Sequence, residues 1–518
     1  MRIGIDVGGT NTDAVLMDGR RVVHAIKTPT TPQVSEGIES ALRQLVQVSR
    51  LDPGELTAVM IGTTHFSNAV AERKHLQQTA CIRLGLPAAA CLPPMVDWPN
   101  ELRGAVGGHG YLAHGGHEFD GRELSALVQD EIAGIARQIR DRGITAVAIS
   151  SVFSPVNSDH EERAAEIVRE EIADADLTLS SSIGGIGLLE RENASILNAA
   201  LGALARRTVE GLEAALAKAG IQAPIYLTQN DGTLMNTGFA ARYPVLTIAS
   251  GATNSMRGAA LLTGAEDAVV VDVGGTTTDV GVLCGGFPRV ASSTVSIGGV
   301  RTNFRMPDTH SVALGGGSIV GADPLSIGPR SVGYELTSKA LVFGGDTLTA
   351  TDVAVAAGAA ELGTPALVNH LDSVLIGSVE DRIEAIILAA VDRVRTSATP
   401  IPAIVVGGGS ILIRRDLAGT SVTLKPEHYA VANAIGAAIG QVGGTCDRVF
   451  SLDEMSRDRA LETARGRGRR WIGRLPPVPP ATPSRSSKST RCRWDTCRAT
   501  RRESRCAPSA PWRGPDDA

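Results

Sequence analysis

The stretch DVGGTTTD at residues 272–279 repeats, with one change, the stretch DVGGTNTD at residues 6–13. Asn11 in the first copy stands where the second has Thr277. The copies lie about half of the 518-residue chain apart. Solenoid repeats recur every 20 to 50 residues or so, and a repeat at this much larger scale instead indicates two similar domains that face each other.

Each copy lies beside apolar stretches that predict strands: Arg2–Val7 and Ala14–Met17 around the first, and Ala268–Asp272 before the second. A glycine-rich turn between two strands lets backbone N–H groups approach an oxyanion, because glycine adopts angles closed to other residues. We interpret both copies as phosphate-binding hairpins. The carboxylates of Asp6 and Asp272 suit Mg²⁺, which prefers oxygen ligands. The residues expected to contact the phosphates of ATP are Gly8, Gly9, Thr10, Thr12, Gly274, Gly275, Thr276 and Thr278.

A third glycine-rich turn, Gly407-Gly408-Gly409-Ser410, follows the predicted strand Ile404–Val406. Such a turn lets the backbone lie flat against an adenine and its ribose. Two phosphate hairpins followed by this turn resemble the actin-like ATPase superfamily, which pairs two related domains around ATP. The resemblance implies an α/β fold with two ribonuclease H-like domains that flank a nucleotide cleft and carry inserted subdomains. The adenosine site would then be Gly407, Gly408, Gly409 and Ser410.

Composition and charge narrow the class of protein. The 58 glycines and only 3% aromatic residues suit an α/β protein with many tight loops around small ligands. The formal net charge of −5 gives no basic footprint for nucleic acid. No apolar run approaches the roughly 20 residues that span a bilayer, and the chain starts with a predicted strand instead of a signal peptide, so we expect a cytoplasmic protein. The seven cysteines include no CxxC pair, which argues against a zinc or iron–sulfur site.

Further motifs are spread over the region from residue 1 to about residue 440. Beyond the two hairpins they are Gly62–Arg73, Leu189–Ala194, Leu197–Ala199, Ser250–Ala252, His310–Ser318, Gly328-Pro329 and Thr351-Asp352. In combination they resemble the ATP-dependent hydantoinase/oxoprolinase family, specifically the shorter branch of its A-type subunits. Asn11 departs from the family pattern, in which many members carry an aromatic residue.

The resemblance implies an enzyme that uses ATP and Mg²⁺ to open a cyclic amide: a hydantoin, 5-oxoproline or a related lactam. An amide is a poor electrophile because its nitrogen donates into the carbonyl, and phosphorylation of the amide oxygen would open the carbonyl carbon to water. Many relatives work with a B-type subunit, so we expect an oligomer with a second subunit and no nucleic-acid or membrane partner. The family also contains subunits of ketone carboxylases. A small-molecule kinase of the same superfamily and an ATP-dependent switch that activates a partner protein stay open as alternatives.

Two histidines are candidates for catalytic roles beside Asp6 and Asp272. His65 follows a Gly-Thr-Thr turn after the predicted strand Ala58–Ile61, where active-site groups tend to gather, and a capping or packing role fits equally. His310 precedes a second glycine-rich, anion-friendly loop at residues 315–318.

Two other charged groups have plainer interpretations. Gly107–Gly121 carries three histidines and two acids, but their spacing favours an exposed or substrate-contacting loop over a metal site. Glu190–Glu192 falls on the predicted helix Leu189–Ala219, where an exposed charged face is the default and the family resemblance adds a substrate- or interface-facing role. Gly202 and Gly211 are candidate breaks in that helix. The residues of the loop that could ligate a metal are His109, His114, His117, Glu118 and Asp120.

We divide the chain into three parts. Residues 1–185 form an N-terminal domain with the first hairpin, and residues 186–445 form the ATPase domain with the second hairpin and the adenosine turn. Residues 446–518 form a tail that becomes rich in Arg, Ser and Pro, which predicts disorder rather than a nucleic-acid-binding arm. Read one nucleotide earlier, the same DNA can encode a family-like ending. A frameshift near residues 464–470 is therefore a further hypothesis, which resequencing the gene would test.

Overall fold

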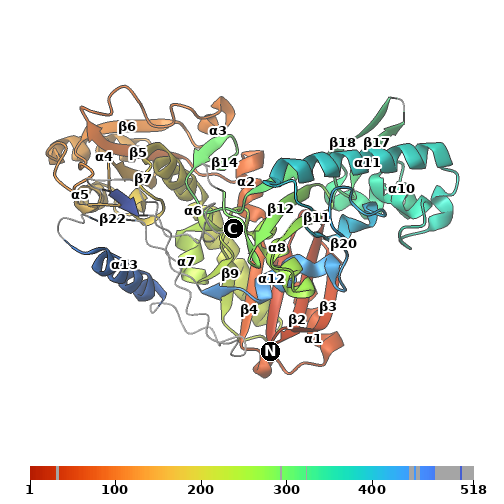
Figure 1. The fold of residues 1–518 in the computed structure, drawn as a ribbon. Helices are drawn as coiled ribbons and strands as arrows, with labels where there is room; N and C mark the ends of the chain where they lie inside the picture. Colours follow the sequence, from red (N-terminus) through yellow and green to blue (C-terminus); the bar gives the residue numbers. More distant parts are fainter. Residues whose placement is uncertain are drawn as a thin grey trace, which may run out of the picture.

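A computed structural model describes residues 1–30, 34–291, 295–322, 324–442, 448–450, 455–472 and 502–504. Two lobes, each with its own sheet, lie side by side, and a third sheet extends from the first lobe at the upper left of Figure 1. Most of the predicted tail lies outside the described residues, so its disorder and the frameshift stay predictions. No helix among the described residues combines the length and apolar character needed to cross a bilayer.

The first lobe is built on a seven-stranded sheet in the order β21-β10-β9-β4-β1-β2-β3. Strands β1, β2 and β3 form an antiparallel meander, and β4 and β9 add on in parallel beyond β1. Ile3 and Ile5 of β1 belong to a core with helix α1 (Val34–Ser49) and the second half of α6 (Leu188–Lys218). The strands are β1 (Arg2–Val7), β2 (Asn11–Asp18), β3 (Arg21–Pro29), β4 (Ala58–Thr63), β9 (Ile225–Thr228), β10 (Thr233–Asn236) and β21 (Gln441–Val442).

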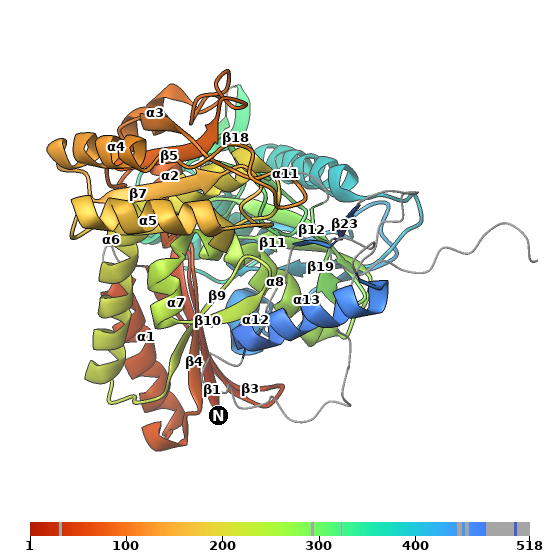
Figure 2. The ribbon, with the colours of Figure 1, turned by 90° about the vertical axis from the view of Figure 1, so that its left-hand side faces the viewer.

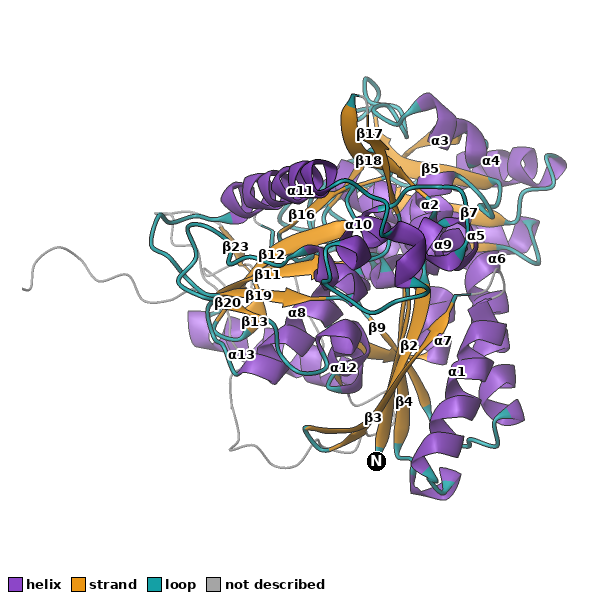
Figure 3. Ribbon diagram, turned by 90° about the vertical axis from the view of Figure 1, so that its right-hand side faces the viewer, coloured by secondary structure: helices purple, strands orange, loops and turns teal. Residues whose placement is uncertain are grey.

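The second lobe repeats this topology in the order β13-β12-β11-β19-β20, with β16 also paired to β12. The strand pairs β11–β12 and β12–β13 are again antiparallel, and β19 and β20 are again parallel to β11. This repeated ribonuclease H-like arrangement confirms the predicted fold class. Helix α11 (Ser373–Val394) covers one face of the sheet (Figure 3). The strands are β11 (Ala268–Val273), β12 (Thr278–Cys284), β13 (Phe287–Pro288), β16 (Thr309–Val312), β19 (Ala403–Val406) and β20 (Thr423–Leu424).

The insertion in the first lobe is a four-stranded parallel sheet in the order β6-β5-β7-β8. Its strands are β5 (Thr79–Leu86), β6 (His109–His114), β7 (Ala146–Ser151) and β8 (Asp176–Leu179), with helices α4 (Gln129–Asp141) and α5 (Asp159–Glu171) packed against it. Of these strands only β7 was predicted, and β6 occupies part of the expected loop Gly107–Gly121. A short strand among glycines carries too few apolar residues to stand out by period.

Helix α6 connects the insertion to the first lobe without a break (Figure 2), so the proposed breaks at Gly202 and Gly211 are wrong. Its first half packs on the insertion and its second half on α1. A side-chain carbon on Gly202 would lie 2.7 Å from Asp176 Oδ2, and one on Gly211 would lie 3.4 Å from Ser35 Cβ. Both glycines therefore admit close neighbours instead of ending the helix.

The remaining elements are short. In the first half of the chain they are α2 (His65–Glu72), α3 (Asn100–Ala105) and α7 (Thr237–Arg242). In the second half they are β14 (Val295–Ile297), β15 (Val300–Thr302), β17 (Ser318–Ala322), β18 (Leu325–Ser331), α9 (Leu336–Lys339), α10 (Ala350–Ala356), β22 (Arg448–Phe450), α13 (Arg457–Ile472) and β23 (Arg502–Ser504).

Two helices lie between the lobes and cross tightly. Helix α8 (Ser250–Thr263) packs on the sheet of the second lobe, and α12 (Ala432–Ala438) packs on that of the first. A side-chain carbon on Gly436 would lie 1.8 Å from the carbonyl oxygen of Asn254, and one on Gly258 would lie 2.0 Å from that of Ala432. Glycine at both crossing points lets the two backbones touch.

Replacing Gly436 by Ala is expected to lower the free energy of unfolding by about 1–3 kcal/mol, because the new methyl group overlaps rigid backbone. The matched control is Gly377→Ala on α11, where a side-chain carbon would meet nothing within 4 Å. The control is expected to be neutral, or stabilising by up to about 1 kcal/mol, because alanine favours helix. Urea unfolding measures both, and equal midpoints for the two variants would contradict the tight crossing.

Candidate active site between the two hairpins

Both predicted hairpins form, and their geometry is the same. Asp6 lies opposite Asp13 across β1 and β2, and Asp272 lies opposite Asp279 across β11 and β12. The Gly8 N–H donates to the Asn11 carbonyl at 3.0 Å, and the equivalent bond from Gly274 to Thr277 is 2.9 Å long. Since directly opposed residues share a sheet face, each hairpin presents a pair of carboxylates on one side.

The tips of the two hairpins meet. A side-chain carbon on Gly275 would lie 2.0 Å from Thr10 Oγ1, so only glycine allows this approach. The second tip is supported from behind, because Gly316 N–H donates to the Gly274 carbonyl at 3.0 Å and Gly317 N–H donates to that of Gly275 at 2.7 Å. Thr351 Oγ1 in turn donates to the Gly316 carbonyl at 2.8 Å. The glycine-rich loop after His310 and the Thr351-Asp352 motif thus brace the second hairpin.

The carboxylates of Asp6 and Asp272 are both buried, with 4% and 8% of their surface exposed. Burial, with repulsion from Asp13, raises the pKa of Asp6 to about 7, although Asn433 and Lys27 act to lower it. Burial, with repulsion from Asp279, raises the pKa of Asp272 to about 7 as well. The two groups are thus held in an environment that disfavours their charge.

Asn433 of α12 lies between the two carboxylates. Its Nδ2 donates to Asp6 Oδ2 at 3.3 Å, and the same side chain lowers the pKa of Asp272. Asn433 therefore connects the two hairpins from the helix that crosses between the lobes. The sequence analysis missed it, because a single asparagine in an Ala- and Gly-rich stretch gives no pattern.

Several buried oxygen atoms around this point accept no hydrogen bond within the chain. They include Asp6 Oδ1, Thr10 Oγ1, Asn254 Oδ1, Asn433 Oδ1 and Ser410 Oγ. Asn254 of α8 is close to Asp6, because a side-chain carbon on Gly62 would lie within 2.8 Å of both of their side chains. Buried polar atoms without partners indicate a bound ion, water or ligand. Carboxylate and amide oxygens are ligands that suit Mg²⁺, so the residues present fit the metal.

The predicted adenosine turn packs directly against the second hairpin. Gly407 has a φ of +88°, and a side-chain carbon there would lie 2.3 Å from Asp272 Oδ1. A side-chain carbon on Gly409 would lie 2.4 Å from the Gly274 carbonyl oxygen. The turn therefore requires glycine, and it brings the predicted nucleoside site beside the predicted metal site.

The structure treats the remaining predicted site residues differently. The hydroxyls of Thr12 and Thr278 are fully buried and contact Thr30 Oγ1 and the Leu314 carbonyl, whereas Thr276 is partly exposed. His65 begins α2 beside the first hairpin, where Thr64 Oγ1 donates to the Val7 carbonyl at 3.2 Å. Burial, with nearby His75 and Arg207, lowers the pKa of His65, which favours its neutral form. These roles stay predictions.

His310 lies away from the carboxylates. It is opposite Val280 on β16, while its neighbour Ser311 is opposite Asp279 and donates to it. Successive strand residues point to opposite faces. His310 therefore points to the other face of the sheet from the one that carries Asp272 and Asp279.

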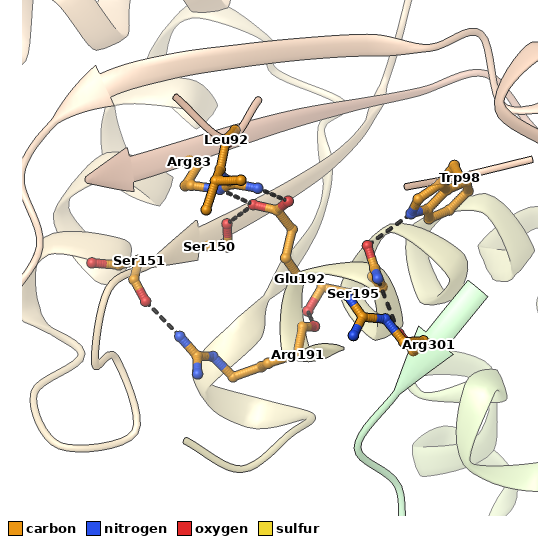
Figure 4. Close-up of polar contacts among 10 residues, drawn as sticks. Arg83, Leu92, Trp98, Ser150, Ser151, Arg191, Glu192, Ser195 and Arg301 are labelled. Carbon is orange, nitrogen blue, oxygen red and sulfur yellow. Dashed lines mark hydrogen bonds and ion pairs between the residues drawn. The ribbon is translucent and has the colours of Figure 1, made fainter. Parts of the chain in front are cut away.

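The expectation of an exposed charged face at Glu190–Glu192 is wrong, because Arg191 and Glu192 are fully buried. Arg83 of β5 pairs with Glu192 at 2.5 Å, and Ser150 Oγ donates to the same carboxylate at 2.6 Å (Figure 4). Arg191 donates to the Ser151 carbonyl at 2.5 Å. The helix sequence alone does not reveal these partners, which lie on other strands.

The predicted histidine loop holds no metal cluster, since the described part of the chain contains no group of three or more His, Cys, Asp or Glu side chains arranged to hold one. His117 is buried, and its ring packs on His160 at 4.3 Å between centroids. His160 in turn contacts Glu123 at 3.2 Å. His114 pairs separately with Glu131.

Two related lobes, each with a DVGGT hairpin that points a buried aspartate at the other, define an actin-like ATPase fold. Residues 2–172 match the N-terminal region of the hydantoinase/oxoprolinase family, and residues 191–362 match the hydantoinase/oxoprolinase region itself. Together these matches cover about two thirds of the chain. The chain belongs to the hydantoinase/oxoprolinase family.

Individual relatives fall into two activity classes by name. The chain is 28% identical over 385 residues to the caprolactamase subunit alpha of Pseudomonas jessenii, covering 69% of this chain and 54% of the relative. It is 29% identical over 393 residues to the acetophenone carboxylase gamma subunit of Aromatoleum aromaticum, covering 69% and 53%. The chain therefore spans about half the length of these curated relatives.

Two solved structures share the fold. The ATP-dependent caprolactamase from Pseudomonas jessenii aligns with a TM-score of 0.71 at 24% identity, covering 91% of this chain and 76% of that one. Nucleotide-free acetone carboxylase aligns with a TM-score of 0.69 at 17% identity, with the same two coverages. At these identities the likeness establishes the fold alone.

Replacing Asp272 by Asn is expected to stabilise the nucleotide-free protein in a chelator at pH 8. The folded-state pKa of about 7 lies above the unfolded value near 3.8. As the pH rises between these values, the unfolded chain releases a proton that the folded chain retains, so the free energy of unfolding falls and the full penalty persists above pH 7. Asparagine avoids that penalty, which amounts to at most about 4 kcal/mol.

Urea unfolding of the wild type and of Asp272→Asn at pH 4 and pH 8 measures this difference. The gain is expected at pH 8 and should nearly vanish at pH 4, where the buried carboxyl is protonated in the wild type. A variant that is less stable than the wild type at pH 8 contradicts the assignment of a buried, repelled carboxylate.

The contact between the hairpin tips gives a second prediction with its control built into the repeat. Gly275→Ala is expected to lower the free energy of unfolding by about 1–3 kcal/mol, because its methyl group overlaps Thr10. Gly9 is the equivalent position in the first hairpin, and a side-chain carbon there would meet nothing within 4 Å. Thermal unfolding compares Gly275→Ala with Gly9→Ala, and equal losses would show that the tips do not touch.

Proposed function

We propose that the chain is the ATP-hydrolysing subunit of an enzyme that opens a cyclic amide by phosphorylating the amide oxygen. The observation that carries the proposal is the pair of buried carboxylates, Asp6 and Asp272, brought together by Asn433 with unpaired oxygen atoms around them. An arrangement of this kind suits a metal-bound polyphosphate. Membership of the hydantoinase/oxoprolinase family, and a relative named as a caprolactamase subunit, support the cyclic amide as acceptor.

In the proposed reaction the amide oxygen attacks the γ-phosphorus of ATP and ADP leaves. Water then adds to the activated carbon. Collapse of that adduct releases phosphate and breaks the ring C–N bond, and the nitrogen takes up a proton. The protein's part is positioning and charge neutralisation, as in phosphoryl transfer generally.

Each residue set has a distinct task in this proposal. Asp6 and Asp272 would hold Mg²⁺, which neutralises phosphate charge when bound. The hairpin backbones, with Thr10 and Thr276, would contact the phosphates, since Thr12 and Thr278 already contact other parts of the chain. The turn at residues 407–410 would contact the nucleoside. His65 lies close enough to the first hairpin for a role on the substrate side, whereas His310 has no such position.

A second subunit belongs to the proposal. The caprolactamase and acetophenone carboxylase relatives are both named as subunits, and this chain spans about half the length of each. We therefore expect ATP turnover to respond to a cyclic amide most strongly when the partner protein is present.

Product analysis by phosphorus NMR separates the proposed hydrolase from a kinase of the same fold. With ATP, Mg²⁺ and hydantoins, 5-oxoproline or lactams, the account expects free phosphate together with ring opening. A phosphorylated product that persists would assign the chain to the kinases. ATP turnover that responds to a protein but to none of these amides would assign it to the switches.

Asp272→Ala is expected to lower ATP hydrolysis by a factor on the order of 100 to 1000, because the variant removes one of the two carboxylates proposed for the metal. The matched control is Asp392→Ala, whose carboxylate on α11 is 78% exposed. A coupled assay for ADP measures both variants, and circular dichroism checks that each is folded. Near-normal turnover in Asp272→Ala contradicts the proposed metal site.

A further inference from the structure

The proposed ATP site has an unresolved charge balance. The two hairpins contribute four aspartates, Asp6, Asp13, Asp272 and Asp279, and their sequences contain no lysine or arginine. ATP brings further negative charge into the same place. Because like charges at short range repel strongly where water is excluded, a polyphosphate needs a cation from elsewhere in the chain in addition to a metal ion.

Lys27 is positioned to supply that cation. It lies opposite Asp13 in the pairing of β2 and β3, and its Nζ is 2.5 Å from Asp13 Oδ1. The Asp13 side chain is 11% exposed, while 32% of the Lys27 side chain remains exposed. The lysine is therefore anchored at one side and open to solvent at the other.

The ammonium group of Lys27 also reaches the second lobe. A side-chain carbon on Gly408 would lie 3.5 Å from Lys27 Nζ and 3.8 Å from its Cε. Gly408 belongs to the proposed nucleoside turn, which packs on the second hairpin. Lys27 thus extends from a strand of the first lobe to the turn of the second, across the space that the phosphates next to the nucleoside would occupy.

The electrostatics agree with this placement. The positive charge of Lys27 acts to lower the pKa of Asp6 and also that of Asp272, one from each hairpin. A single ammonium that influences both hairpin carboxylates lies close to the centre of the site. An ordinary surface ion pair with Asp13 alone would not require this position.

We propose that Lys27 is a nucleotide-binding residue whose ammonium contacts the phosphates of ATP and ADP from across the cleft, with Asp13 as its anchor. The inference rests on the proposed ATP site. It assigns phosphate recognition to a residue outside both hairpins, and it makes Asp13 a positioning residue that holds the lysine.

Calorimetric titration of ATP, ADP and adenosine, each with Mg²⁺ present, tests the proposal on the full chain. Lys27→Met is expected to weaken binding of ATP and ADP about 10- to 100-fold, as for loss of a hydrogen bond to a charged group, and to leave adenosine binding unchanged. Lys27→Arg keeps the charge and should recover most of the affinity. Lys218→Met removes an exposed lysine, 67% open to solvent on α6, and should bind all three ligands like the wild type.

Lys27→Met also strands the buried Asp13 carboxylate, which alone costs stability. The double variant Asp13→Asn/Lys27→Met compared with Asp13→Asn removes this complication, because neither variant contains an unpaired aspartate. Loss of ATP and ADP affinity between these two supports the proposal. Unchanged affinity for both, or an equal loss for adenosine, overturns it, whereas a wild type that binds no ATP refutes the proposed function itself.

Discussion

The structure depends on the burial of two aspartates, one from each lobe, at the place where the lobes meet. Asp6 and Asp272 both have a pKa of about 7, and burial is the main cause for each. A carboxylate without water loses its solvation, and no lysine or arginine lies within either hairpin to replace it. The chain thus carries an unfavourable electrostatic arrangement in its ligand-free state, and a bound cation would relieve it.

The rest of the fold brings these two groups together and keeps them there. Each aspartate ends the buried central strand of a five-strand ribonuclease H-like core, so its position is set by a complete sheet. Between the sheets, α8 and α12 touch through Gly258 and Gly436 and supply Asn254 and Asn433 to the same point. The helix crossing and the polar site are therefore one construction. The glycines let the helices approach, and the approach positions the asparagines.

How far the sequence predicts this structure depends on whether the deciding interactions are local. The hairpins were predictable, because a DVGGT stretch between two strands specifies its own turn and its repetition implies the second lobe. The burial of Arg191 and Glu192 was not predictable, since their partners Arg83 and Ser150 lie on other strands. Asn433 and Lys27 escaped for the same reason, because each has meaning only beside residues of the opposite lobe or strand.

The central claim is that the two hairpins make one metal–nucleotide site. Electron paramagnetic resonance of Mn²⁺, titrated into the protein with a non-hydrolysable ATP analogue, tests it directly. The account predicts one nucleotide-dependent Mn²⁺ site per chain, lost in Asp6→Asn and equally lost in Asp272→Asn. A site that survives either substitution, or two sites each lost with only one of them, would contradict it.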